Sequence, residues 1–201
     1  MPIRRGPAQV RRALQCAPSP PVVIHATFSA PMAQLPIIEY PNPRLRVVTE
    51  PVDAGRIADP GFQRLLDDML QTMYEAPGIG LAAPQVDIME RFTVVDVTDE
   101  RDQPIVLVNP VIRERSDELR VHQEGCLSIP GVFADVSRAD GIQVEALDRE
   151  GKPFVLRADG LLATCIQHEI AHLDGKLFID YLSPLKRSMA LKKLDKLRKR
   201  G

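Results

Sequence analysis

The segment from Asp159 to Gly175 constrains the fold of this chain more than any other. Its apolar residues recur at helical spacing and cover an arc of about 200° around the helix axis, so the helix is expected to be buried on most sides. The same segment carries two histidines and a glutamate, in the pentapeptide from His168 to His172. Such side chains are costly to bury without a partner, so the fold must supply one, such as a metal ion.

The pentapeptide His168-Glu169-Ile170-Ala171-His172 predicts metal-assisted hydrolysis. Its two histidines are about 40° apart around a helix, so both imidazoles can reach one ion from the same face. Glu169 projects about 60° further round than His172, beside the ion without binding it, which is the position that a general base for water needs. The alternative is a surface helix with two ordinary histidines, which the wide apolar arc makes less favourable.

A catalytic zinc site needs a third protein ligand as well as a water. The string HEIAHLDGKLF fits the metzincin pattern until its last position, where Phe178 cannot bind a metal. A thermolysin-like site would take a later glutamate, but the chain has none after Glu169. Cys126 is a further candidate, because one thiolate with two imidazoles suits zinc or ferrous iron. A lone cysteine is otherwise more often a small buried hydrophobe.

The segment GIGLAAPQ, from Gly78 to Gln85, superficially matches a dinucleotide-binding fingerprint. It follows a predicted helix rather than a strand, and Pro84 lies where the phosphate-binding helix should run, so this class of site is excluded. The two glycines allow a backbone to approach a ligand closely, and the Gln85 amide can donate to a developing oxyanion. A tight structural turn is the alternative interpretation.

Length and composition indicate one soluble domain. A chain of 201 residues with 44% hydrophobic and 26% charged residues can bury one sizeable core, and no apolar run is long enough to span a bilayer. Its three cysteines, Cys16, Cys126 and Cys165, cannot form a disulfide framework. Their wide spacing suits a reducing, cytoplasmic compartment.

The N-terminal segment differs from the rest of the chain. Residues 1–31 hold six prolines and four arginines, no acidic residue and no hydrophobic period. We therefore predict that residues 1–33 are a disordered extension, or a non-native one if Met32 is the true start, and that residues 34–201 form the domain. Organelle targeting is disfavoured, because serines are few and the prolines would interrupt an amphipathic helix.

The remaining patterns predict an α+β fold. Asp59 and Pro60 mark the start of an amphipathic helix that ends before Pro77. Short segments rich in branched residues predict strands whose close spacing favours antiparallel pairing. A terminal helix over residues 184–200 is expected to dock by its leucines and to have a basic outer face, which is more often a solvated charge run than a nucleic-acid site. The predicted strands lie around residues 92–97, 105–108, 141–147 and 154–156.

Three segments, GIGLAAPQ, EGCLS and QHEIAHLDG, together resemble the three motifs of the peptide deformylase family in order and approximate spacing. The likeness extends from about Leu35 through the string FIDYLSPLKR. It implies a monomeric α+β enzyme in which antiparallel sheets surround a central helix bearing the HExxH motif, followed by a C-terminal helix. Such an enzyme removes the N-formyl group from the N-terminal methionine of new polypeptides and releases formate. The family's usual metal is Fe²⁺, with Zn²⁺ or Ni²⁺ as substitutes.

The resemblance also implies a role for each matching residue. Glu169 is expected to take a proton from the attacking water, while Gln85 and the backbone N–H of Leu127 stabilise the oxyanion. The implied metal ligands are Cys126, His168 and His172. The implied substrate-binding residues are Ile79, Gly80, Glu124, Leu161 and Cys165, with the edge of the His168 ring completing a methionine pocket.

Two residues depart from the family pattern. Ala171 replaces a usual aspartate, which puts the orientation of the metal ligands in doubt, and Phe133 replaces an arginine common in bacterial relatives, which puts contacts at the rim of the site in doubt.

A metallopeptidase and an inert metal-binding relative remain rival functions. The basic terminal helix implies, by the same resemblance, docking on the ribosome.

Overall fold

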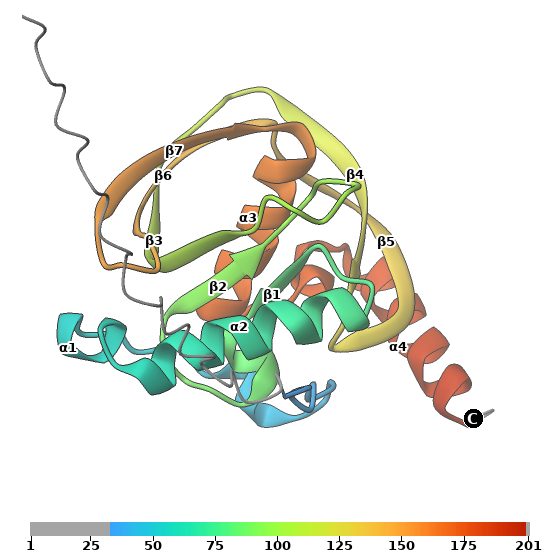
Figure 1. Cartoon of the computed structure of the whole chain (residues 1–201). Helices are drawn as coiled ribbons and strands as arrows, with labels where there is room; N and C mark the ends of the chain where they lie inside the picture. The colour runs from blue at the N-terminus through green and yellow to red at the C-terminus, as the bar shows by residue number, and fades with distance from the viewer. Residues whose placement is uncertain (1–32, 200–201) are drawn as a thin grey trace, which may run out of the picture. The chain divides into compact units, whose positions relative to one another are not determined.

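The computed structural model describes residues 33–199, so residues 1–32 of the predicted extension, Cys16 among them, lie outside the described residues (Figure 1). The described chain forms a five-stranded sheet in the order β1-β2-β3-β6-β7 and a two-stranded sheet, β4-β5, and every pairing is antiparallel. The predicted α+β class is confirmed. The strands are β1 (Gly80–Ala82), β2 (Phe92–Val95), β3 (Ile105–Arg115), β4 (Leu119–Cys126), β5 (Ile129–Ala139), β6 (Gly141–Leu147) and β7 (Pro153–Asp159).

In residues 33–199, four α-helices and three short 3-10 helices accompany these strands. The prediction of a helix capped by Asp59 is confirmed, since the Asp59 carboxylate accepts hydrogen bonds from the first backbone N–H groups of α2. The helices are α1 (Ala54–Ile57), α2 (Pro60–Glu75), α3 (Gly160–Leu173) and α4 (Pro184–Arg198), and the 3-10 helices are η1 (Pro43–Arg46), η2 (Ala83–Val86) and η3 (Phe178–Tyr181).

The helix α3 lies between the two sheets, as its apolar arc predicts (Figure 1). Every residue from Ala163 to Leu173 is buried, and the helix contacts β1, β2, β6 and β7 of one sheet and β4 and β5 of the other. A glycine with positive φ lies at each end of the helix: Gly160, its first residue, has φ 54°, and Gly175, two residues beyond its last, has φ 68°. The HExxH residues are therefore carried on the most enclosed element of the fold.

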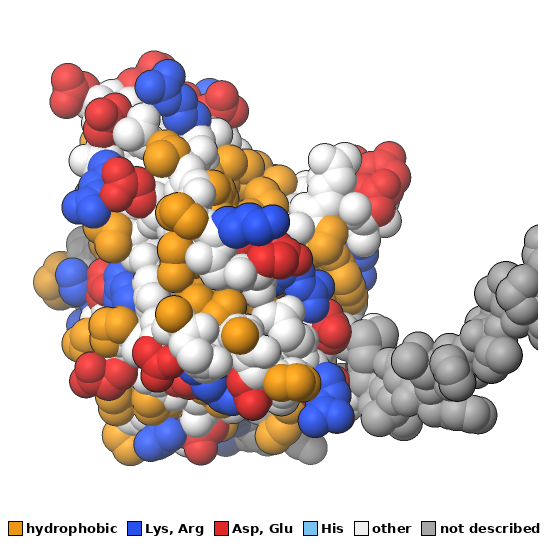
Figure 2. Space-filling view, turned by 60° about the vertical axis from the view of Figure 1, so that its left-hand side comes forward, with side chains coloured by type: hydrophobic (Ala, Val, Ile, Leu, Met, Phe, Trp, Pro, Cys, Tyr) orange, Lys and Arg blue, Asp and Glu red, His pale blue; other side chains and the backbone are white. Residues whose placement is uncertain are grey.

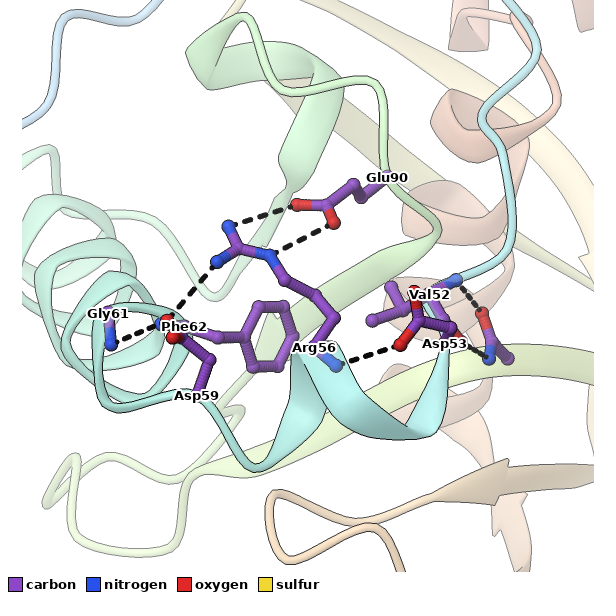
Figure 3. A network of polar contacts seen from close by, with 8 residues as sticks. Val52, Asp53, Arg56, Asp59, Gly61, Phe62 and Glu90 are labelled. Atoms are coloured by element: carbon purple, nitrogen blue, oxygen red, sulfur yellow. Dashed lines mark hydrogen bonds and ion pairs between the residues drawn. The ribbon is translucent and has the colours of Figure 1, made fainter.

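A polar network holds α1 and α2 against the segment that leads into β2 (Figure 3). The Arg56 guanidinium donates to both Glu90 oxygens, at 3.1 and 3.3 Å, and its central carbon lies 5.3 Å from the centre of the Phe62 ring. Phe62 in turn packs edge-on against Phe92 of β2. This network holds α1 and α2 in place, and α2 in turn packs against β1.

Two findings go beyond the sequence patterns. The β4-β5 hairpin and β1 are not among the predicted strands, and β3 continues from Val108 to Arg115. The terminal helix ends at Arg198 and packs against β5 through Ala190 and Leu194, but Leu185 and Met189 are 71% and 63% exposed. The expected docking is thus confirmed for only part of its apolar residues.

The surface presented in Figure 2 intersperses positive, negative and hydrophobic side chains. Exposed ion pairs such as Arg113 with Glu145 and Arg149 with Asp67 neutralise charge locally in the described chain. Pairs of this kind contribute little to stability, and they keep single-sign patches small. None of the described helices is both long enough and apolar enough to cross a membrane.

Candidate active site

Cys126, His168 and His172 form one cluster at the junction of β4 and α3. Their ligand atoms all lie within 4.8 Å of one another, and Cys126 Sγ is 3.1 Å from His172 Nε2. The pairing of β4 with β5 shifts register between Gly125 and Cys126, so the cysteine lies at the irregular end of the hairpin, over α3. One thiol and two imidazoles are a donor set that fits zinc or ferrous iron.

Glu124 orients the His168 ring through its Nδ1 atom. The Glu124 carboxylate accepts from both Nε and Nη2 of Arg138, and one of its oxygens is 2.8 Å from His168 Nδ1. Burial raises the pKa of this carboxyl, but hydrogen bonds from Arg138 and His168 outweigh burial and bring the pKa to about 2. With Nδ1 engaged by a carboxylate, His168 is left with Nε2 for the cluster.

Glu169 is the carboxylate beside the cluster. It is 4% exposed, and its Oε2 has no hydrogen-bond partner within the described chain. Burial raises the pKa of Glu169 to about 7, although the neighbouring His168 opposes the rise. A buried carboxyl with a pKa near neutrality can both accept and return a proton.

Gln85 is fixed by bonds at both ends of its amide. Its Oε1 accepts from the backbone N–H of Ala82 at 2.8 Å, which leaves Nε2 directed toward Ser128 Oγ at 3.3 Å and Cys126 Sγ at 3.6 Å. The side chain is 2% exposed. The structure therefore brings the GIGLAAPQ segment against the EGCLS segment, with an amide donor next to the thiol.

A cavity of about 550 Å³ opens beside the cluster. The lining includes ten of the eleven residues predicted from the sequence; the exception is His172, which belongs to the ligand cluster but does not line the cavity. These predicted lining residues are Ile79, Gly80, Gln85, Glu124, Cys126, Leu127, Leu161, Cys165, His168 and Glu169. Gly78 and Phe133, which the sequence analysis discussed, also line the cavity. The lining residues that sequence analysis missed are Ala76, Pro77, His122, Gln123, Gly125, Pro130, Gly131 and Thr164.

Sequence analysis also missed Arg138, the partner of Glu124. It is buried, at 6% exposure, and its guanidinium carbon lies 4.6 Å from the centre of the Tyr181 ring. A lone arginine among strand residues carries no distinctive pattern. The one available signal was general: a buried carboxylate needs a cation as its partner.

The two residues that depart from the family pattern occupy different places. Ala171 is buried on α3, at 4% exposure, and Nδ1 of the adjacent His172 has no hydrogen-bond partner in the described chain. Phe133 lines the cavity at 58% exposure, with its ring over Gly125, where an added Cβ would lie 2.6 Å from Phe133 Cε1. The departure at Phe133 therefore gives the cavity an aromatic rim.

Comparison with known proteins identifies the family. The polypeptide deformylase family model matches residues 34–188. The chain is 66% identical over 168 residues to peptide deformylase 2 of Xanthomonas campestris pv. campestris, and 61% identical to the peptide deformylase of Stenotrophomonas maltophilia R551-3; each match covers 84% of this chain and 98% of the relative. The crystal structure of a peptide deformylase from Legionella pneumophila superposes with a TM-score of 0.79 at 47% identity, covering 83% of this chain and 96% of that one.

These findings confirm the resemblance carried by the three motifs. Members of the family are metalloenzymes, and they hydrolyse the N-formyl group from the amino terminus of nascent polypeptides. A candidate metal-binding group and a cavity beside it are both present in the described chain. The chain belongs to the polypeptide deformylase family and is a hydrolase of formylated nascent peptides.

Proposed function

We propose that this chain deformylates its substrates with Cys126, His168 and His172 as metal ligands and Glu169 as the general acid and base. The assignment rests on one observation: ligand atoms from two motifs lie within 4.8 Å of one another, and the neighbouring Glu169 has a buried carboxylate oxygen without a partner in residues 33–199. The preferred metal is Fe²⁺, with Zn²⁺ or Ni²⁺ as substitutes, since one thiolate and two imidazoles suit each of them. When bound, the metal polarises the formyl oxygen and makes water more acidic.

Glu169 moves the protons of the reaction. Its Oε2 takes the proton of the attacking water, and the same carboxyl then returns a proton to the nitrogen of the leaving amine. The pKa of about 7 supports this double role, because neither protonation state is strongly preferred near neutral pH. Burial of the carboxyl within α3 also keeps bulk water away from it.

Gln85 and Leu127 stabilise the oxyanion that forms at the formyl carbon. The Gln85 amide is held with Nε2 toward Cys126, so it is oriented before the substrate arrives. The backbone N–H of Leu127 follows Cys126 directly and is proposed as the second donor. Both donors come from segments that pack against the ligand cluster.

The cavity beside the cluster receives the first residue of the substrate. Its apolar wall is formed by Ile79, Leu161 and Cys165, which suits an unbranched methionine side chain. Gly80 is proposed to contact the substrate backbone. Glu124 supports His168, because its carboxylate is already engaged with Arg138 and His168.

Formate release from formyl-Met-Ala-Ser by the metal-loaded protein tests this assignment. A Glu169→Ala variant should lose at least about 100-fold in kcat/KM, because it lacks the proton-transfer group. Glu100→Ala, an exposed residue of the loop after β2, is the matched control and should keep full activity. Wild-type activity in Glu169→Ala would contradict the assignment.

We further propose that residues 34–201 are the catalytic domain, and that the protein acts as a cytoplasmic monomer that docks on the ribosome through α4. Exposed Leu185 and Met189 lie among basic residues on this helix, which is a surface suited to RNA phosphates and nearby protein.

Co-sedimentation with ribosomes tests the docking proposal. Deletion of residues 185–201 should abolish co-sedimentation. Because Ala190 and Leu194 belong to the core, a second variant, Lys192→Glu with Lys196→Glu, removes the charge without removing the helix and should also weaken binding. Unchanged co-sedimentation of the charge-reversed protein would count against the docking proposal. The proposed monomeric state is tested separately, by sedimentation velocity.

A further inference from the structure

Of the two histidines that line the cavity, only His168 has a role in the proposed chemistry. The other, His122, lies on β4 two residues before Glu124, so its side chain leaves the same face of the strand as Glu124. Within the described chain the His122 side chain makes no hydrogen bond, and its Nε2 is buried without a partner. An unpaired buried nitrogen is costly, so its presence in a cavity wall calls for an explanation.

The contact between Glu124 and His168 fixes where His122 lies relative to α3. Two strand residues, about 6.6 Å, separate Glu124 from His122, and one helical turn, about 5.4 Å, separates His168 from Thr164. The Glu124 carboxylate is 2.8 Å from His168 Nδ1, and two residues further along β4 Cys126 Sγ is 3.1 Å from His172, four residues further along α3. The two elements therefore run in the same direction, and the matching step back from Glu124 and His168 leads to His122 and Thr164. His122 and Thr164 both line the cavity there, one step away from the ligand cluster.

That level is where the end of the substrate's first side chain belongs. The formyl carbon must lie at the cluster, and the side chain of the first residue then extends along the wall that contains Leu161 and Cys165. An unbranched side chain of methionine length spans about one helical turn. Its terminal atoms would therefore reach the part of the wall formed by His122 and Thr164.

The polar groups of Thr164 and Cys165 on this wall are already paired. Thr164 Oγ1 donates to the carbonyl of Gly160 at 3.0 Å, and the Cys165 thiol donates to the carbonyl of Ile79 at 3.4 Å. His122 Nε2 has no partner within the described chain, and a rotation of the ring about Cβ–Cγ would turn this buried nitrogen toward the cavity. A neutral imidazole donates from one nitrogen, so a substrate acceptor at this place would give it the partner that the protein does not.

We propose that His122 is a specificity-determining residue that lets the enzyme accept a first residue whose side chain ends in a hydrogen-bond acceptor, methionine sulfoxide above all. This inference rests on the proposed function of the cavity. The thioether sulfur of methionine is a weak acceptor, so a hydrogen bond from an imidazole N–H to it adds little binding energy. The oxygen of a sulfoxide is polar and can accept such a hydrogen bond. Oxidised formylmethionyl peptides are therefore substrates of this enzyme.

The test compares kcat/KM for three peptides: formyl-Met-Ala-Ser, its methionine sulfoxide form, and the norleucine form, which has no sulfur. In the His122→Leu variant, hydrolysis of the sulfoxide peptide should fall about tenfold relative to wild type, the loss expected for one hydrogen bond. Hydrolysis of the methionine and norleucine peptides should stay the same or rise. His122→Gln keeps an N–H donor and should retain the sulfoxide peptide as a substrate.

Val121→Ala is the matched control, because Val121 is 63% exposed on the opposite face of β4 and does not line the cavity. If wild type and His122→Leu discriminate between the sulfoxide and methionine peptides by the same factor, the inference is overturned and the proposed function stands. If wild type hydrolyses none of the three peptides, the proposed function fails and the inference fails with it.

Discussion

At the scale of single residues, Gly80 shows why the site needs a position without a side chain. A Cβ added to Gly80 would lie 2.8 Å from Cys165 Sγ and 2.8 Å from Glu169 Cδ, closer than packed atoms allow. Both neighbours are buried on α3 and have little room to move. The glycine therefore lets β1 approach Glu169, the proposed general base, as closely as the fold requires.

Gly80→Ala is expected to lower kcat/KM for formyl-Met-Ala-Ser by about 100-fold or more, because displacing Glu169 by even 1 Å misaligns proton transfer. The measurement is formate release together with thermal unfolding, which separates a misplaced base from an unfolded protein. Gly141→Ala is the matched control, since its Cβ would meet other atoms only at ordinary contact distances, and it should remain fully active. An active Gly80→Ala enzyme would show that the Glu169 position is not critical.

At the scale of elements, the buried pair of Glu124 and Arg138 joins β4, β5 and α3. Both side chains are at most 5% exposed, and Arg138 also reaches the carbonyl of Gln167 on α3 at 3.5 Å. A buried charge that loses its partner is strongly destabilising, whereas loss of both charges costs much less. The pair therefore ties the hairpin that carries Cys126 to the helix that carries the histidines.

Arg138→Met should lower the free energy of unfolding by about 3–5 kcal/mol, because it leaves the Glu124 carboxylate buried and uncompensated. The double variant Glu124→Gln with Arg138→Met should recover a large part of that loss, which a double-mutant cycle from urea unfolding would measure. Arg113→Met, which removes an exposed arginine, should change little. Equal losses in the single and double variants would contradict a charge-pair role.

The loop that follows β2 is held by a buried carboxylate. Asp96 is 2% exposed and accepts hydrogen bonds from Tyr74 Oη at 2.7 Å, from Thr98 Oγ1 at 2.6 Å and from the backbone N–H groups of Thr98 and Gln103. Burial raises the pKa of Asp96, but the hydrogen bonds from Thr98 and Tyr74 outweigh it, so the pKa lies below its ordinary value. This carboxylate stabilises the folded state only when it is ionised.

A pKa that is lower in the folded than in the unfolded state contributes stability above the unfolded value, near 4, and that contribution is lost as the pH falls through the folded value. Asp96→Asn should therefore cost about 1–3 kcal/mol at pH 7. The difference from wild type should shrink below about pH 4. Urea unfolding at several pH values measures both effects. Asp99→Asn, an exposed change in the same loop, should show no such pH-dependent difference.

At the scale of the whole molecule, the domain proposal predicts that residues 1–31 are dispensable. The family match begins at residue 34, and 168 residues of this chain cover 98% of the relative from Xanthomonas campestris pv. campestris. A protein that starts at Met32 should have the same melting temperature and the same rate of formate release as the full chain. A lower melting temperature or a slower rate would assign the segment to the catalytic domain.

Local patterns predicted much of this molecule. The apolar arc around residues 159–175 predicted an enclosed helix, and the chemistry of the missing third ligand led to Cys126, which lies beside both histidines. The β4-β5 hairpin, the approach of Arg138 to Glu124 and the place of His122 were not predicted. These depend on pairing between segments distant in sequence, which leaves little periodic signal in either segment. Likewise, the leucine spacing of α4 did not show that Leu185 stays exposed.

The contact between α4 and β5 connects the terminal helix to the wall of the cavity. Leu197 near the end of α4 lies against Gly131, which lines the cavity. Any surface that holds α4 therefore also holds the cavity mouth at a set distance and direction. If α4 docks as proposed, a chain that emerges from that surface would meet the site at an effective concentration set by the tether, in the millimolar range for short flexible linkers.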